Sequence, residues 1–256
     1  MKRRQFIRAA GILAAVPAVE SMASVQSSGA KEKEIYEWRI YTLTEGKTDL
    51  DNFYQQVLIP AYNTFNISVG AFSLYKKEDR EKRFYLFVYP DITTFHQVKQ
   101  NIWKNESFCK AARPFYEASA VNPVYTAFET FLCEAFDRIP QLSRPDKDRT
   151  IFEFRNYKSP NEEANQRKVK MFNVDEMAIF DKVGINPVCY GEVLAGPRMP
   201  SLIYLTWYKD IDTRNEAWKK FGEHPDWLRI KSLPEYANTA TDNKNVLLSP
   251  MSYSQI

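Results

Sequence analysis

The chain has 256 residues, enough for two domains of ordinary size that each bury a core without disulfide or metal support. Its 8 glycines are few and its aromatic share of 14% is high. This composition is typical of side-chain-filled packing and argues against a glycine-rich phosphate-binding enzyme.

Residues 1–23 have the three parts of a targeting segment: a basic start, an apolar run and a small-residue cleavage site. Arg3-Arg4 followed by Gln5-Phe6 resembles the bacterial twin-arginine export signal, whose cargo crosses the membrane folded. An ordinary secretory signal is the alternative. A helix needs about 20 apolar residues to span a bilayer, and the apolar run is well short of that length. We therefore expect a periplasmic protein with no stable membrane anchor after cleavage, beginning with a disordered leader at 24–34.

The charge of the mature chain follows from this cleavage. The segment holds four basic residues and one acidic residue, a net +3 that equals the formal charge of the whole chain, so +3 − 3 = 0 remains. The charged residues of the segment are Lys2, Arg3, Arg4, Arg8 and Glu20. A near-neutral chain removes the main support for a nucleic-acid or anionic-membrane partner. A small-molecule ligand is the expected partner, and homo-oligomerisation stays open.

One strand motif occurs twice. Ile35-Tyr36-Glu37-Trp38-Arg39-Ile40-Tyr41 returns as Ile151-Phe152-Glu153-Phe154-Arg155-Asn156-Tyr157. Under the two-residue period of a strand, each copy has one apolar face and one face that carries a Glu, an Arg and a Tyr. Because a surface strand scatters its charges, both faces are expected to have partners.

The first half, residues 35–136, follows the order β-α-β-β-α-β of a ferredoxin-like unit. After the motif strand we expect a helix that Asp49 or Asp51 caps and Pro60 kinks, then two strands, helical segments and a fourth strand. These elements are expected at about 49–65, 67–75, 84–89, 92–116 and 125–133.

Residues 137–149 are polar and turn-rich and form the expected linker. The second half, residues 150–256, repeats the order of the first. Its elements are expected at about 150–157, 161–182, 185–194, 202–208, 212–221, 226–233 and a short final strand at 246–248.

The third strands also have two faces, one aliphatic and one rich in tyrosine, which includes Tyr85 and Tyr204. A four-stranded sheet with helices on one side leaves its other side uncovered. We therefore expect the two sheets to cover each other as a barrel-like sandwich, with the Glu, Arg and Tyr side chains inside.

The repeated Glu-x-Arg-x-Tyr strand, the third strands that end near Asp-Ile, and Glu223-His224-Pro225-Asp226-Trp227 together resemble the NIPSNAP family over nearly all of residues 34–250, in two copies. The resemblance implies an α+β fold, a dimeric α+β barrel formed within one chain by two tandem ferredoxin-like repeats. It also implies a relation to cofactor-free monooxygenases, small isomerases and haem enzymes. The family has no agreed activity, and fold does not determine function.

The candidate ligand site lies on the charged face. It comprises Glu37, Arg39, Tyr41, Tyr85, Glu153, Arg155, Tyr157 and Tyr204. Each glutamate stands one pleat from its arginine, so the pairs could be buried ion pairs that only fix the register of the sheets. Two arginines and several tyrosines facing one cavity would instead suit a small carboxylate or phenolic ligand.

The motifs for catalysis and cofactors are sparse. His96 and His224 are too few for a three-histidine metal site, no cofactor is evident, and nucleotide and serine-hydrolase patterns are absent from the sequence. His224 is a candidate acid or base, or else it caps the following helix. Cys109, Cys133 and Cys189 lack CxxC spacing, and the sequence does not choose a disulfide among them.

Two functions therefore stay open. One is a protein that binds a small, partly aromatic or carboxylate-bearing ligand between its sheets. The other is a cofactor-independent monooxygenase or isomerase.

Overall fold

The computed structural model describes residues 32–44, 49–76 and 81–256. The predicted targeting segment and most of the predicted leader lie outside these ranges, so their export function stays a prediction. Within the described ranges, no helix combines the length and the hydropathy that a membrane crossing needs.

Both halves have the predicted element order. The first half contains β1 (Ile35–Leu43), α1 (Asp49–Phe53), η1 (Tyr54–Leu58), α2 (Ile59–Asn63), β2 (Ser68–Leu74), β3 (Lys82–Tyr89), α3 (Ile92–Asn101), η2 (Ile102–Lys104), α4 (Glu106–Val121) and β4 (Tyr125–Ala135). The second contains β5 (Ile151–Lys158), α5 (Glu162–Met171), η3 (Phe172–Glu176), α6 (Met177–Val183), β6 (Asn186–Ala195), β7 (Ser201–Tyr208), α7 (Ile211–Glu223), α8 (Pro225–Ile230), η4 (Pro234–Tyr236) and β8 (Asp242–Pro250). The final strand is longer than predicted.

The helices that follow the third strands begin at matching caps. The Asp91 carboxylate accepts from the Thr94 backbone N–H at 2.6 Å, and the Asp210 carboxylate accepts from that of Thr213 at 2.7 Å. Each cap satisfies a backbone donor that the first helical turn leaves free. The repeated Asp-Ile pair is thus the start signal of α3 and of α7.

The first helix of each half contains a π-helical turn that the sequence did not predict. In the first half, η1 separates α1 from α2, and Pro60 comes after it, near the start of α2. In the second half, η3 lies between α5 and α6 and contains no proline. The expected kink at Pro60 is therefore not the common cause of the irregularity. Such turns often occur at functional sites.

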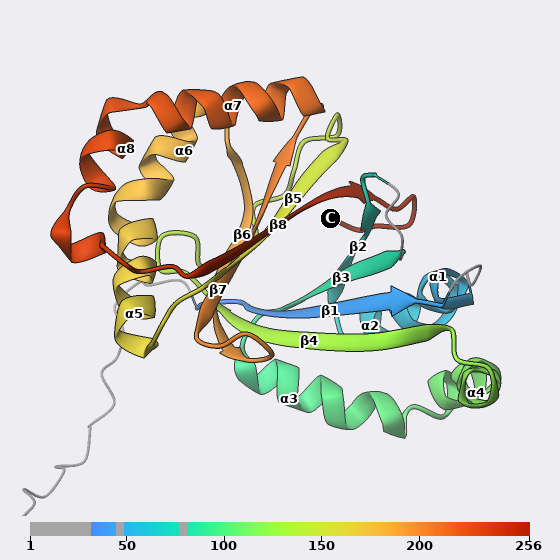
Figure 1. Ribbon diagram of the computed structural model, residues 1–256. Helices are drawn as coiled ribbons and strands as arrows, with labels where there is room; N and C mark the ends of the chain where they lie inside the picture. The colour runs from blue at the N-terminus through green and yellow to red at the C-terminus, as the bar shows by residue number, and fades with distance from the viewer. Residues whose placement is uncertain (1–31, 45–48, 77–80) are drawn as a thin grey trace, which may run out of the picture. The chain divides into compact units, whose positions relative to one another are not determined.

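The eight strands close into one antiparallel barrel in the order β1-β3-β2-β8-β5-β7-β6-β4, with helices around the outside (Figure 1). The halves meet at two short joints, where Phe72–Leu74 of β2 pair with β8 and Leu132–Ala135 of β4 pair with β6. The prediction that the two sheets cover each other is correct at this level.

The prediction that the charged strand faces point into the barrel is wrong. The barrel interior is an apolar cluster that draws on all eight strands and on no helix. Trp38 and Phe154 meet there edge to face, with ring centroids 4.9 Å apart. The apolar motif face thus fills the barrel, and the face with Glu37, Arg39 and Tyr41 lies beneath the helices.

The reason for this orientation is the supply of hydrogen-bond partners. A buried charge is tolerated only where donors or acceptors compensate for its lost hydration. Helix residues such as Tyr62 and Lys99 supply these partners to the charged face. The opposing sheet presents mainly apolar side chains. The two-residue period separated the faces correctly but carried no information about which one meets the helices.

Candidate functional site

The eight predicted site residues form two clusters, one in each half, between the barrel wall and its outer helices. The strand registers place Arg39 beside Tyr85 and Arg155 beside Tyr204, so the clusters occupy corresponding positions. The sheets keep the clusters apart, and they do not share one cavity between the sheets as predicted.

The first cluster is built around a saturated carboxylate. Glu37 accepts from Arg39 Nε at 2.9 Å and Nη2 at 3.0 Å, from Tyr89 at 2.7 Å and from Lys99 at 3.0 Å. Arg39 also donates to Tyr62 at 2.8 Å. Burial opposes ionisation of Glu37, but the Arg39 and Lys99 charges and these hydrogen bonds lower its pKa to about 2. This arrangement is a buried ion pair, the structural alternative that the sequence had left open.

Aromatic rings occupy the remainder of the first cluster. The hydroxyls of Tyr41 and Tyr54 are 3.0 Å apart, and the Tyr54 ring stacks on that of Tyr85 with centroids 3.5 Å apart. The Tyr85 hydroxyl donates to Asp51 at 3.3 Å. Tyr54 comes from the π-helical turn η1, so this turn delivers the ring that covers Tyr85.

The pKa of Glu37 predicts a pH dependence of folding. Its pKa falls from an ordinary 4.5 to about 2, so its contribution is complete above pH 4.5 and is lost as the pH falls towards 2. At 1.36 kcal/mol per pKa unit, the contribution is about 3 kcal/mol. Urea unfolding of Glu37→Gln and the parent between pH 2 and 6 should show a stability difference that shrinks by about this amount at the acid end. Parallel curves would contradict this assignment.

The second cluster pairs its glutamate differently. Glu153 accepts from Arg214 Nε at 3.1 Å and Nη2 at 2.5 Å, and from Trp218 Nε1 at 2.7 Å. Arg155 Nη1 stands 3.4 Å from the Glu153 carboxylate, an ionic contact without a hydrogen bond. The arginine of the motif is thus displaced from its own glutamate by α7.

Arg155 is left with an unsatisfied donor. Its Nε donates to Asn245 of β8 at 3.0 Å, and its guanidinium lies over the Trp218 ring, 3.9 Å from the centroid. Nη1 is buried and has no hydrogen-bond partner among the described residues. Arg39, by contrast, has no buried donor that lacks a hydrogen-bond partner. The second cluster therefore has an arginine donor that could accept an anion, and the first does not.

Two further buried pairs complete the second cluster. The Tyr204 hydroxyl donates to that of Tyr157 at 2.9 Å, and Lys168 donates to Glu176 at 3.1 Å. Glu176 lies in the π-helical turn η3, which corresponds to η1 of the first half. Both π-helical turns therefore contribute a side chain to the clusters.

Sequence reasoning missed Arg214, Trp218 and Asn245. A signal for the first two was present: when the two Asp-Ile caps are aligned, Arg214 stands where the first half has Phe95, and Trp218 stands where it has Lys99. Asn245 had no such signal, because its role depends on β8 pairing with β5 and placing it opposite Arg155.

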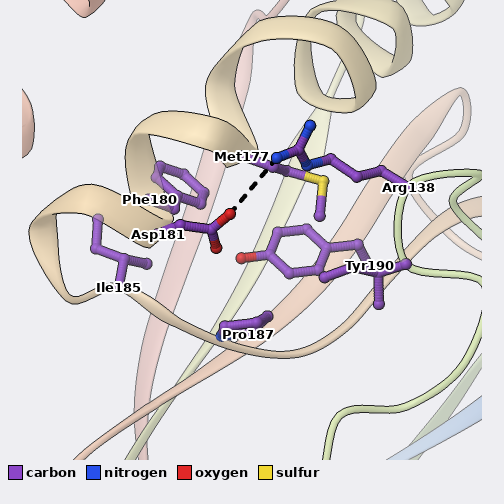
Figure 2. A pocket seen from close by; sticks show the side chains of 8 residues that line it. Arg138, Met177, Phe180, Asp181, Ile185, Pro187 and Tyr190 are labelled. Carbon is purple, nitrogen blue, oxygen red and sulfur yellow. Dashed lines mark hydrogen bonds and ion pairs between the residues drawn. The ribbon is translucent and has the colours of Figure 1, made fainter.

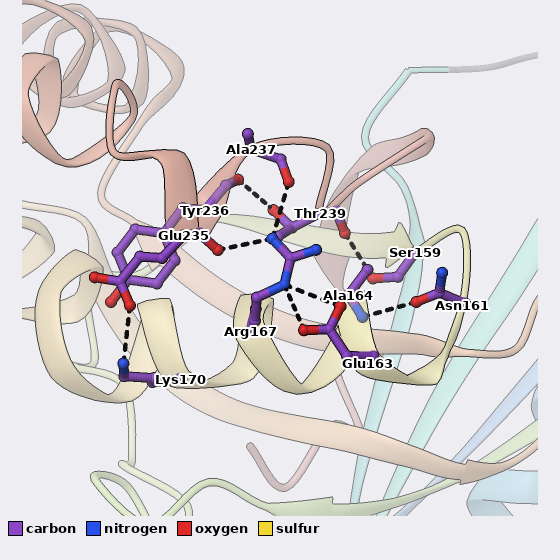
Figure 3. Close-up of polar contacts among 10 residues, drawn as sticks. All are labelled: Ser159, Asn161, Glu163, Ala164, Arg167, Lys170, Glu235, Tyr236, Ala237 and Thr239. Atoms are coloured by element: carbon purple, nitrogen blue, oxygen red, sulfur yellow. Dashed lines mark hydrogen bonds and ion pairs between the residues drawn. The ribbon is translucent and has the colours of Figure 1, made fainter.

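A network of polar contacts holds the segment that leads into β8 (Figure 3). Arg167 of α5 donates to the carbonyls of Glu235 at 2.7 Å and Ala237 at 3.0 Å. Ser159 donates to the Thr239 carbonyl at 2.7 Å. These contacts secure the chain just before β8 and so help to position Asn245 beside Arg155.

The histidines lie outside the clusters. His224 caps α8, because its Nδ1 accepts from the Asp226 backbone N–H at 3.2 Å. His96 contacts Gln100 on α3 at 2.9 Å. In the described part of the chain, no hydrogen bond or ion pair connects either histidine to Arg155. That part of the chain also contains no group of three or more side chains able to hold a metal ion, and its three cysteines are free.

Solved structures with the same fold cover most of the chain. A "putative monooxygenase" from Fusobacterium nucleatum subsp. nucleatum ATCC 25586 has 11% identity and a TM-score of 0.55, with 86% of this chain and 93% of that chain covered. A "putative monooxygenase" from Lactobacillus acidophilus NCFM has 11% identity and a TM-score of 0.56, with 86% and 94% covered. An anthrone oxidase-like protein has 10% identity and a TM-score of 0.53, with 87% and 93% covered.

These similarities define the class: an α+β protein with the dimeric α+β barrel fold of monooxygenase-like proteins. At this identity they show the fold alone. Residues 152–255 match the family model named NIPSNAP, which confirms the predicted resemblance for the second half. A comparison with curated proteins found no match.

Proposed function

We propose that the protein binds a small, partly aromatic carboxylate at Arg155, between the second-half sheet and its helices. The observation that carries this proposal is the buried Nη1 of Arg155, which has no hydrogen-bond partner among the described residues. A buried donor without a partner costs free energy, and more when it is charged. A ligand carboxylate would recover that cost through a charge-assisted hydrogen bond.

The surrounding side chains explain why the ligand should be both anionic and aromatic. Glu153 already accepts from Arg214 and Trp218, and Lys168 is paired with Glu176. Arg155 keeps only the 3.4 Å ionic contact of its Nη1 with Glu153, which leaves that donor without a hydrogen bond. The guanidinium also lies over the Trp218 ring. An aromatic ligand could pack against such rings while its carboxylate meets Nη1.

Access is expected from the side of β8. The Arg155 side chain is 10% exposed, and Asn245, which it contacts, is exposed on β8. This route differs from the predicted site between the sheets, where apolar side chains fill the barrel.

The oxygenase or isomerase alternative gains no specific support. His224, its candidate acid or base, accepts a helix-capping hydrogen bond, and no hydrogen bond or ion pair among the described residues links it to the Arg155 cluster. The structural neighbours named as monooxygenases share only the fold with this chain, so their names do not support an activity here. Binding is therefore the function that we test first.

The two halves supply a matched test of the binding proposal. Benzoate should raise the melting temperature of the parent protein, and at ten times Kd the stabilisation should be about 1.4 kcal/mol. Arg155→Met should abolish this response, whereas Arg39→Met should retain it because Arg39 is already paired with Glu37. The neutral analogue benzamide should have little effect on any variant.

Three results would contradict the proposal. The first is that neither benzoate nor other small aromatic and aliphatic acids stabilise the parent. The second is that benzoate stabilises Arg155→Met as much as the parent. The third is that benzamide matches benzoate.

We also infer that residues 35–136 are a second, diverged copy of the family domain, joined by the 137–149 linker to the matched half. The corresponding element orders, the caps at Asp91 and Asp210 and the paired π-helical turns support this inference. A superposition of the halves that aligned β1 with a strand other than β5 would contradict it.

A further inference from the structure

A cavity of about 310 Å³ opens on the outside of the second half, and its lining does not include Arg155. Its wall is formed by the start of the linker, helix α6 and the strand β6 (Figure 2). The lining residues are Arg138, Ile139, Met177, Phe180, Asp181, Ile185, Pro187 and Tyr190.

One polar group at the cavity, the Tyr190 hydroxyl, makes no hydrogen bond to the described residues and borders the open space. Tyr190 as a whole is 1% exposed. Figure 2 shows this hydroxyl directed into the space bordered by Phe180, Asp181 and Ile185. Burial raises the pKa of Tyr190 well above its ordinary value, so the hydroxyl stays protonated and can donate.

The Tyr190 ring is held firmly in this position. It stacks on the Tyr204 ring with centroids 5.0 Å apart and an interplanar angle of 6°. Tyr204 is itself fixed by its hydrogen bond to Tyr157. The donor that faces the cavity is therefore preorganised, which lowers the entropic cost of binding a ligand.

The charged groups at the cavity cancel each other. Arg138 Nη2 and Asp181 Oδ2 form an ion pair at 3.5 Å, drawn as a dashed line in Figure 2. The remaining lining is mostly apolar and includes the flat ring of Phe180 and the thioether of Met177, groups that pack well against aromatic ligands. The volume is at the lower end of ligand pockets, which span about 300 to 1,000 Å³.

We propose that this cavity binds a neutral, single-ring aromatic molecule with a carbonyl or hydroxyl oxygen that accepts a hydrogen bond from Tyr190. Neutrality follows from the Arg138–Asp181 pair, ring size from the volume, and the acceptor oxygen from the unsatisfied hydroxyl. The cavity is distinct from the carboxylate site, because Arg155 does not line it, although Phe180 of the cavity meets Trp218 of that site edge to face.

The test uses acetophenone as the oxygen-bearing probe and ethylbenzene as its counterpart without an acceptor, with affinities measured by ligand-observed NMR. Acetophenone should bind saturably and more tightly than ethylbenzene. Tyr190→Phe should weaken acetophenone binding about tenfold, the usual effect of one hydrogen bond, and leave ethylbenzene unchanged. Tyr208→Phe is the matched control, because Tyr208 is buried outside the cavity, and should change neither affinity.

A second variant tests the location without touching the buried tyrosine. Ile139 is half-buried at the cavity, so Ile139→Trp should obstruct it and abolish binding of both probes. Arg155→Met should leave acetophenone binding unchanged, which separates this site from the proposed carboxylate site. The proposal is overturned if acetophenone shows no saturable binding, if it binds no better than ethylbenzene, or if Tyr190→Phe or Ile139→Trp binds it as tightly as the parent.

Discussion

Arg39→Met is expected to lower the free energy of unfolding by about 3 kcal/mol, and Arg155→Met by only about 1 kcal/mol. Breaking a buried pair by removing one partner typically costs about 3 to 5 kcal/mol, because the other charge is left uncompensated. Glu37 would lose its bidentate partner but keep hydrogen bonds from Tyr89 and Lys99, which favours the lower end of that range.

Arg155 occupies the corresponding place with a different consequence. If it is removed, Glu153 still accepts from Arg214 and Trp218, so no carboxylate is left without a donor. The loss is confined to the Asn245 hydrogen bond and the packing on Trp218, offset by relief of the unsatisfied Nη1.

The measurement is urea unfolding of both variants and the parent at pH 7 without added ligand. Methionine is suitable at both positions because it retains much of the apolar length of arginine. Equal losses in the two variants would contradict the assigned difference between the clusters. A larger loss for Arg155→Met would reverse it and show that Glu153 depends on Arg155 after all.

Trp38→Ala is expected to destabilise the protein by about 3 to 5 kcal/mol, the range for removing a large aromatic side chain from a packed core. Trp38 is 1% exposed in the barrel interior, and it contacts Phe154 of the other half. Trp103→Ala is the matched control, since Trp103 is 58% exposed, and it should cost far less.

A double-mutant cycle with Phe154→Ala isolates the contact between the halves. Edge-to-face aromatic pairs contribute about 0.5 to 1.5 kcal/mol beyond their buried area, so the coupling energy should fall in that range. Additive losses would show that the two rings stabilise their own halves separately. A small loss for Trp38→Ala would contradict the assignment of this face to the barrel interior.

Much of the fold was predictable from the sequence because its signals are local or periodic. The alternation in the two motif strands separated an apolar from a charged face, and Asp91 and Asp210 marked two helix starts. The repeated motif itself indicated two corresponding halves. Each of these features depends on residues close together in the chain, where spacing alone carries the physical information.

Only the tertiary structure decided which strand face meets the helices and how the two clusters differ. Glu37 and Glu153 share the pattern Glu-x-Arg-x-Tyr, yet one forms hydrogen bonds with its neighbouring arginine and the other with Arg214 from α7. The cost of burying a charge depends on which donors distant segments bring within reach, and pleat spacing does not contain that information. The two proposed sites depend on the Arg155 donor and the Tyr190 hydroxyl, which lack hydrogen-bond partners. Both result from packing between elements that are distant in the sequence.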